Sequence, residues 1–393
     1  MKNNEKRRLF DAFLLTQKNK PKGLYVHFPF CSSKCYYCDF LSYQNQEKRM
    51  KPYLEALKRE IVIYNTDEKI PVDTIYLGGG TPSYIPVELM AEIMKSIKDN
   101  FEVSSESEIT IEINPEHLTD EAINSYLSMG INRASVGVQS FNDRLLKVLG
   151  RSHDSETAVS SILNLRKFGF KNISIDIINA IPTQNIEESL EDIKKAIELS
   201  PKHLSLYSLI LEPNTHMSRL VNIGQLELVD EETDREMFYA ASELLSKSGY
   251  DKYEISNFAR PGFESIHNTK YWKLDEYIGL GLGSSSFYNS YRYSNIVNIN
   301  EYQKLSGTDK PIEERELMDY DSLKTDYILM GLRLVEGINL KEYIKIFGVD
   351  FYSEYKKYID LFIREGHMFM TDERIAFTPS GMDISNRFFV EIV

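Results

Sequence analysis

Six short β-like runs alternate with helical segments between Leu24 and about Ile210, and this rhythm restricts the fold more than any other feature of the sequence. Each run is rich in Ile, Val, Leu or Tyr and is bounded by turn residues. The runs cover residues 23–27, 73–77, 108–113, 134–138, 172–178 and 203–209, and helical patterns cover 86–100, 119–129 and 155–168 between them. Strands that alternate with helices indicate a parallel sheet with helices outside it.

The strands carry one aliphatic face and one polar face. In the run 109–113 the isoleucines share one face, whereas Thr110 and Glu112 share the other. The same alternation is found in residues 135–139, 173–177 and 204–207. A doubly wound sheet buries both faces, and a closed eight-strand barrel fills its interior with bulky branched side chains. We therefore predict an α/β fold built on a partial barrel of six strand–helix units, with a hydrated, ligand-bearing interior.

The pattern changes after the sixth unit. Residues 230–248 predict a helix, and residues 256–300 are rich in aromatic residues and glycine without a clear period. Helical stretches at 321–334, 340–347 and 352–365 precede a hairpin at 368–371 and 374–378, which resembles a winged-helix arrangement. This part carries no strong basic stripe, so we expect it to pack or act as a lid rather than bind DNA. The predicted division is an N-terminal extension (1–22), a barrel core (23–215), an extension (216–315) and a mostly helical C-terminal module (316–393).

Composition excludes several classes of protein. The net charge of −13 argues against nucleic acid as the main partner, because phosphate binding needs an excess of Lys and Arg. Residues 1–22 lack the apolar stretch of a signal peptide, and no run of about 18 apolar residues predicts a membrane span. We therefore expect a cytoplasmic protein. Peripheral membrane contact and a homodimer are left open.

The chain has three cysteines, and all of them lie within eight positions: Cys31, Cys35 and Cys38. They follow the first predicted strand directly, at the carboxyl end of the barrel where reactive groups gather. Three thiolates at this spacing can hold one metal centre and leave a coordination position open. The alternative is a structural zinc site, in which His27 would complete a tetrahedron.

Two further features indicate a ligand inside the barrel. Residues 78–82 form a glycine run after the second strand, which either lets a ligand approach the backbone or is a plain turn. Glu112 and Asp176 are carboxylates at inward positions, where an unpaired charge is costly. They need either a cationic ligand or internal salt bridges, for instance with Arg133 or Arg151.

The pattern Tyr25-x-His27-x-Pro29-Phe30-Cys31-x3-Cys35-x2-Cys38 resembles the cluster motif of radical S-adenosylmethionine (SAM) enzymes, in the form used by the oxygen-independent coproporphyrinogen III oxidase group. The resemblance covers most of the chain. It implies a [4Fe–4S] cluster held by the three cysteines, with the SAM amino and carboxylate groups on the fourth iron, an electron donor, and a 5′-deoxyadenosyl radical as product of cleavage. It also implies cofactor contacts from Gly79, Gly80, Thr81, Glu112, Gln139, Arg151 and Asp176, and more loosely from Tyr25 and Ile210.

One departure selects a branch of this group. The oxidases carry a fourth cysteine two positions after the third, where this chain has Phe40, and the segment before Tyr25 is short for their substrate-covering segment. The run His267-Asn268-x-x-Tyr271-Trp272 matches the motif of the heme chaperone branch, which implies heme as cargo, delivery to hemoproteins such as respiratory cytochromes, and His267 as a heme-binding residue. From the residues alone, His267 is equally a hydrogen-bonded core residue. The alternatives for function are an oxidase that decarboxylates coproporphyrinogen III and a zinc-binding scaffold.

Overall fold

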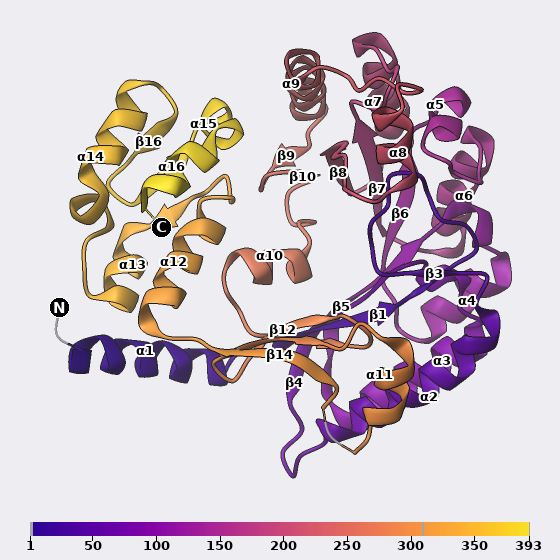
Figure 1. Cartoon of the computed structure of the whole chain (residues 1–393), viewed down its shortest axis with the longest axis horizontal. Helices are drawn as coiled ribbons and strands as arrows, with labels where there is room; N and C mark the ends of the chain where they lie inside the picture. The colour runs from indigo at the N-terminus through magenta and orange to yellow at the C-terminus, as the bar shows by residue number, and fades with distance from the viewer. Residues whose placement is uncertain (1–2, 309, 393) are drawn as a thin grey trace.

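The computed structural model describes residues 3–308 and 310–392, which form a mixed sheet of twelve strands with helices around it (Figure 1). Six strands are parallel neighbours in chain order: β1 (Lys22–Phe28), β4 (Pro71–Gly79), β5 (Glu102–Ile113), β6 (Arg133–Gln139), β7 (Asn172–Asn179) and β8 (His203–Ser208). They coincide with the six predicted runs. The prediction of a parallel strand–helix core is therefore confirmed.

Helices connect these strands on one side of the sheet. They include α2 (Glu47–Ile63), α3 (Val87–Asn100), α4 (Asp120–Ser128), α5 (Asp143–Val148), α6 (Ser155–Phe168) and α7 (Ile186–Glu198). Two further helices, α8 (His216–Asn222) and α9 (Glu231–Lys247), follow the last of the six strands. The predicted ends are correct for α3, α4, α6 and α9 to within one residue. Caps explain this accuracy, because the side chains of Thr119, Asp154 and Asp230 each accept a bond from a first-turn N–H. Gly169 ends α6 in the left-handed region, with φ of 110°.

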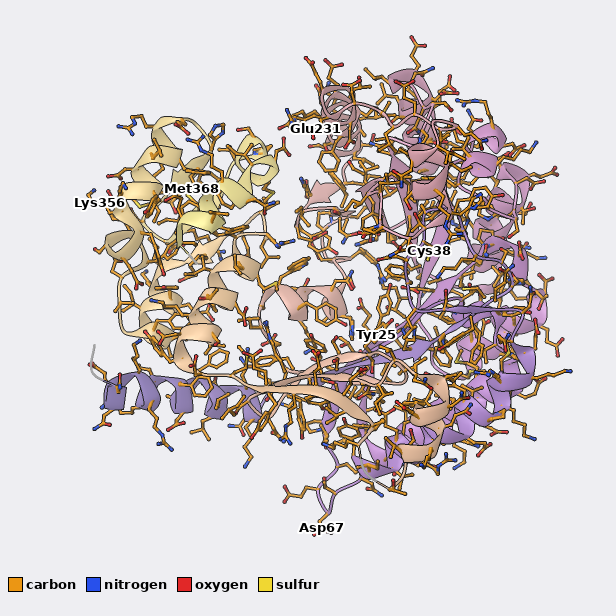
Figure 2. The ribbon with its side chains drawn as sticks, viewed as in Figure 1. Tyr25, Cys38, Asp67, Glu231, Lys356 and Met368 are labelled. Atoms are coloured by element: carbon orange, nitrogen blue, oxygen red, sulfur yellow. The ribbon has the colours of Figure 1, made fainter. Side chains whose placement is uncertain are left out.

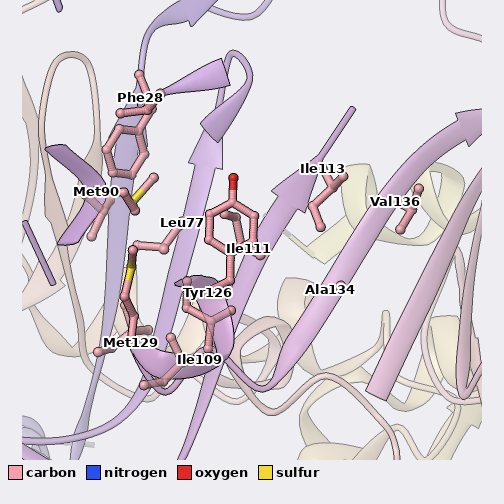
Figure 3. Packing of buried hydrophobic residues seen from close by; sticks show 14 of the residues in the cluster. Phe28, Leu77, Met90, Ile109, Ile111, Ile113, Tyr126, Met129, Ala134 and Val136 are labelled. Atoms are coloured by element: carbon pink, nitrogen blue, oxygen red, sulfur yellow. The ribbon is translucent and has the colours of Figure 1, made fainter. Parts of the chain in front are cut away.

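The aliphatic face of the strands packs beneath the helices. Figure 3 shows Ile109, Ile111 and Ile113 of β5 against side chains that include Met90 of α3 and Tyr126 of α4. All of these side chains are buried in one continuous core. The opposite face of each strand consequently points into the barrel, as the alternation predicts.

Short strands extend both edges of this sheet. On one edge, β11 (Tyr277–Leu280) pairs parallel with β1 and is followed by the antiparallel strands β12 (Ser285–Tyr288), β13 (Tyr291–Asn295) and β14 (Ile312–Leu317). On the other edge, β10 (Asn257–Ala259) pairs antiparallel with β8, and β9 (Asp251–Lys252) follows it. The sequence does not predict these strands, because two to six residues give too little periodicity to identify.

The C-terminal module has its own core. It contains α12 (Tyr320–Gly331), β15 (Ile338–Asn339), α13 (Leu340–Phe347), α14 (Phe351–Arg364), β16 (Met368–Met370), β17 (Arg374–Phe377), α15 (Pro379–Asp383) and α16 (Ser385–Ile392). The three predicted helices and the hairpin are present, and β15 adds a third strand to the hairpin.

The N-terminal residues form a helix that the sequence analysis does not predict, α1 (Asn3–Lys18). Figure 1 shows α1 alongside α12 and α13, far from the barrel helices. Its side chain Phe13 is only 6% exposed because it joins the core of the C-terminal module, where Leu9, Phe10 and Leu14 also pack. The domain boundaries at 22, 215 and 315 stay a prediction. None of the helices described is long and apolar enough to cross a membrane.

Candidate cofactor site in the barrel

The cysteine loop leaves the carboxyl end of β1 and is closed at its base by a small parallel pair. Cys31 ends β2 (Phe30–Cys31), which pairs with β3 (Tyr43–Gln44). Within the loop, the Lys34 Nζ donates to the Phe40 carbonyl at 2.6 Å and to the Ser42 Oγ at 2.8 Å. These bonds join the two arms of the loop between Lys34 and Ser42, and Figure 2 labels Cys38 in this loop and Tyr25 in β1.

All three cysteines line one cavity of about 410 Å³. The Thr81 hydroxyl donates to Cys31 Sγ at 3.4 Å, and the Arg151 guanidinium donates to Cys35 Sγ at 3.2 Å. Burial raises the pKa of the Cys31 thiol and raises the pKa of the Cys38 thiol to about 11. A metal centre that binds here therefore displaces protons from the thiols.

His27 is not placed to complete a zinc site. Its Nδ1 lies 3.0 Å from the Tyr25 hydroxyl and its Nε2 lies 2.9 Å from the Leu41 carbonyl oxygen, so both ring nitrogens are hydrogen-bonded. In the described part of the chain, no three His, Cys, Asp or Glu side chains converge closely enough to bind a single ion. The three thiols line a cavity that is larger than one ion requires. Three thiolates can hold a multi-iron cluster with one iron free of protein ligands.

The glycine run lies directly beside the cysteine loop. The Gly80 N–H donates to the Phe28 carbonyl at 2.9 Å and the Thr81 N–H donates to the Phe30 carbonyl at 2.8 Å. A Cβ at position 80 would lie 2.8 Å from the Phe30 carbonyl oxygen. Gly79 has φ of 113°, and a Cβ there would lie 2.6 Å from the His27 ring. Glycine is therefore required at both positions to bring this segment against the cysteine loop.

The two predicted carboxylates face the cavity and are bound by uncharged donors. Glu112 accepts from the Tyr76 hydroxyl at 2.9 Å and from the Gly79 N–H at 3.0 Å, and burial raises its pKa to about 7. Asp176 accepts from the Ser135 hydroxyl at 3.0 Å, and burial also raises its pKa. None of the ion pairs among the described residues involves either carboxylate, so the alternative of internal salt bridges is not seen.

The other predicted cofactor residues line the same cavity with one exception. Gln139 lies at the end of β6 with φ of 69°, a left-handed conformation that is unusual for a non-glycine residue, at a register shift against β7. Arg151 also donates to the Gly137 carbonyl at 2.8 Å. Ile210 is 70% exposed at the cavity wall. Tyr25 is the exception, because it lies behind Tyr76 and is not part of the lining.

His267 lies outside the cavity. It is on α10 (Ile266–Trp272), its side chain is buried, and burial lowers its pKa to about 3. The imidazole Nδ1 is 2.8 Å from the Thr74 hydroxyl and Nε2 is 2.7 Å from the Tyr271 hydroxyl. Both nitrogens are therefore engaged in this conformation, and ligation of iron by His267 stays a prediction that requires movement of this helix.

Sequence reasoning did not assign several residues of the cavity. These are Phe40, Tyr76, Asn114, Arg133, Ser135, Ser205 and Tyr207. The inward alternation on the strands provides the signal for most of them, since Ser135 and Ser205 belong to the polar face. Phe40, which occupies the position of the fourth cysteine, is 65% exposed and also lines the cavity.

The cavity fits a cluster together with a nucleotide-sized cofactor. Three thiols lie at one end, and the buried carboxylates of Glu112 and Asp176 offer sites for cationic and hydroxyl groups. Gly137 keeps space open in the cavity, because a Cβ at this position would lie 3.0 Å from the Gln139 amide nitrogen and 3.6 Å from the Arg151 guanidinium. The donor set therefore has the chemistry that a [4Fe–4S] cluster and SAM require.

Comparisons with known proteins agree with this geometry. The family model of the radical SAM superfamily matches residues 25–196. The heme chaperone HemW of Lactococcus lactis is 36% identical over 370 residues, covering 94% of this chain and 97% of that protein. HemW of Bacillus subtilis is 32% identical over 94% of this chain and 98% of that protein.

A solved structure shares the fold. Coproporphyrinogen III oxidase (HemN) from Escherichia coli, described as a radical SAM enzyme, matches with a TM-score of 0.83 at 22% sequence identity. The match covers 97% of this chain and 92% of that one. At this identity the match establishes the partial barrel fold, whereas the family follows from the sequence relatives. The chain belongs to the HemW heme chaperone family within the radical SAM superfamily.

Proposed function

We propose that this protein binds heme and transfers it to acceptor hemoproteins in the cytoplasm, with a [4Fe–4S] cluster and SAM held in the barrel cavity. The observation that carries the proposal is the composition of that cavity. The cavity contains three thiols together with polar groups suited to bind SAM. It has Phe40 at the position where the oxidases of the group carry a further cysteine. The proposed heme acceptors are hemoproteins such as respiratory cytochromes. The proposal also includes an electron donor.

Bound together, the cluster and SAM supply one-electron chemistry at the sulfonium sulfur. In the proposed arrangement, Cys31, Cys35 and Cys38 hold the cluster. Glu112 and the Gly79 segment bind the ammonium end of SAM, while Asp176, Gln139 and Arg151 contact its remaining polar groups. Burial favours this role, because carboxylates away from water attract a cation more strongly than exposed ones.

Heme is proposed to bind with the help of His267, the first residue of the His-Asn-x-x-Tyr-Trp motif. Its neighbours Tyr271 and Tyr76 lie in ring contact with it, at centroid distances of 5.1 and 5.3 Å. An imidazole with a lowered pKa is neutral at physiological pH, which is the form that binds iron. Release of the Tyr271 hydroxyl would free Nε2 as the ligand.

A second candidate is the oxidase reaction, in which propionate side chains of coproporphyrinogen III lose carbon dioxide. The fold match to the Escherichia coli oxidase favours it. The residue Phe40 opposes it, since a phenylalanine cannot replace a cysteine in acid–base or metal chemistry.

One anaerobic preparation with a reconstituted cluster distinguishes the two. We expect the protein to bind heme in a Soret titration and to leave coproporphyrinogen III unchanged in the presence of SAM and reductant. His267→Ala should weaken heme binding, whereas His367→Ala, in the C-terminal module, should not. Formation of protoporphyrinogen IX at many turnovers would contradict the proposal and support the oxidase. Zinc in place of iron and acid-labile sulfide would support the scaffold alternative.

A further inference from the structure

Arg133 is a buried cation in the cavity for which the described residues provide no hydrogen-bond or ion-pair partner. It is the first residue of β6, it is only 1% exposed, and it lines the cavity. Its Nε has no acceptor, and the hydrogen bonds and ion pairs among residues 3–308 and 310–392 do not include its guanidinium. Guanidinium stays charged at every physiological pH, so a buried one requires an acceptor.

The acidic residues of the cavity do not supply that acceptor. The oxygens of Glu112 bind the Tyr76 hydroxyl and the Gly79 N–H, and those of Asp176 bind serine hydroxyls. Arg133 acts on both carboxylates only through its field, which partly offsets the effect of burial on their pKa values. The guanidinium fork is therefore available to a ligand.

The position of Arg133 separates it from the cluster end of the cavity. It pairs in register with Asn172, the first residue of β7, and with Thr110 of β5, whereas the cysteine loop follows the carboxyl end of β1. The neighbouring Thr110 Oγ1 and Asn172 Oδ1 are also buried without a partner. Three adjacent strands thus present unsatisfied polar atoms at this inner end of the barrel.

We propose that Arg133 forms a subsite for a carboxylate group of a ligand that enters the barrel cavity. A planar guanidinium matches a carboxylate with two parallel hydrogen bonds.

The ligand's identity rests on the proposed function. Two ligands considered there carry carboxylates, but the methionine carboxylate of SAM belongs at the open iron, at the cysteine end of the cavity. The group assigned to Arg133 is therefore a propionate arm of a tetrapyrrole. If neither heme nor its ester binds, the proposed function fails, whereas equal binding of heme and its ester contradicts this subsite alone, so the two failures can be distinguished.

The test compares each ligand with a form that lacks its carboxylate. Affinities are measured for heme against heme dimethyl ester, and for SAM against decarboxylated SAM, with reconstituted wild type, R133Q, R133K and the control R364Q on the exposed face of α14. Wild type and R364Q should prefer heme over its dimethyl ester by roughly 10- to 100-fold. R133Q should lose this preference, and R133K, which keeps the charge but not the fork, should lose part of it. The preference for SAM over decarboxylated SAM should be the same in every variant.

Each outcome decides the proposal. Loss of the preference for heme, with an unchanged preference for SAM, identifies the propionate as the group that Arg133 binds. Loss of the preference for SAM, an equal heme preference in wild type and R133Q, or no heme preference in wild type would overturn the subsite. If R133Q does not fold, a preference in R133K as large as in wild type overturns the two-bond pairing.

Discussion

Glu112 combines two roles that oppose each other. Its carboxylate lies inside the barrel, where burial raises its pKa to about 7, yet it is the residue proposed to bind the ammonium end of SAM. Between the ordinary pKa near 4.5 and this raised value, the folded protein holds a proton that the unfolded chain releases. The stability of the ligand-free protein therefore falls as pH rises through this window, and the cost is fully present above pH 7.

Glu112→Gln should remove this pH dependence. We expect the loss of unfolding free energy between pH 5 and pH 8 to be smaller in the variant by roughly 1–3 kcal/mol, measured by urea denaturation of the ligand-free protein. SAM affinity should fall, because the amide carries no charge. A variant with the same pH dependence as wild type would show that Glu112 does not titrate in this range.

The cysteine thiols should act as a set. Cys38→Ser leaves two thiolates, which cannot hold a cluster in place, so we expect loss of nearly all iron and acid-labile sulfide after reconstitution. Ser33→Ala lies in the same loop and should keep the wild-type content. Full iron content in the Cys38 variant would show that another residue is a ligand.

At the scale of elements, the cavity depends on the close contact between the segment after β4 and the cysteine loop. The Gly80 and Thr81 N–H groups bond to carbonyls on either side of Pro29, so backbone groups make this contact together with the bond from the Thr81 hydroxyl to Cys31 Sγ. A side chain at position 80 would meet carbonyl oxygens, which cannot rotate away. Glycine at this position therefore fixes the distance between Thr81 and Cys31.

Gly80→Ala should push these two segments apart. The expected result is a loss of roughly 1–3 kcal/mol in unfolding free energy together with weaker retention of iron. Gly169→Asn is the control, because position 169 has open space and asparagine tolerates a left-handed conformation. Normal iron retention in the Gly80 variant would contradict the role assigned to this contact.

The helix α1 offers a second test at this scale. Phe13 is 6% exposed and packs on the C-terminal module, whereas Leu15 on the same helix is 64% exposed. Phe13→Ala should cost roughly 3–5 kcal/mol and make α1 sensitive to limited proteolysis, while Leu15→Ala should change stability by less than about 0.5 kcal/mol. Equal effects of the two substitutions would mean that α1 does not depend on this packing.

At the scale of the molecule, the sequence predicts the helices and strands whose pattern of apolar residues lies within one continuous segment. The six inner strands and their capped helices follow from alternation and from residues such as Asp154. The edge strands do not, because they gain stability only by pairing with the finished sheet. The sequence does not predict the hydrogen bonds of the His267 ring or the lack of a partner for the Arg133 guanidinium among the described residues. Both depend on side chains from distant segments, and a local sequence pattern does not contain them.

The cluster should stabilise the barrel more than the C-terminal module, because their hydrophobic cores are separate. Removing iron with a chelator should lower the melting temperature and increase amide exchange in residues 31–42, which a bound cluster would otherwise restrain. Exchange in α13 and α14 should stay unchanged. Uniform loss of protection over the whole chain would show that the molecule unfolds as one unit.

The packing of α1 on the C-terminal module has a consequence for synthesis on the ribosome. The helix emerges before its partners, which begin at residue 320, so its apolar side chains stay without them for roughly 15–60 s at ordinary rates of translation. During that interval the barrel strands can already pair, while Leu9, Phe10 and Phe13 stay open to chaperones or to nascent chains nearby. A bulky fusion tag at the amino end would therefore interfere with the last folding step rather than the first.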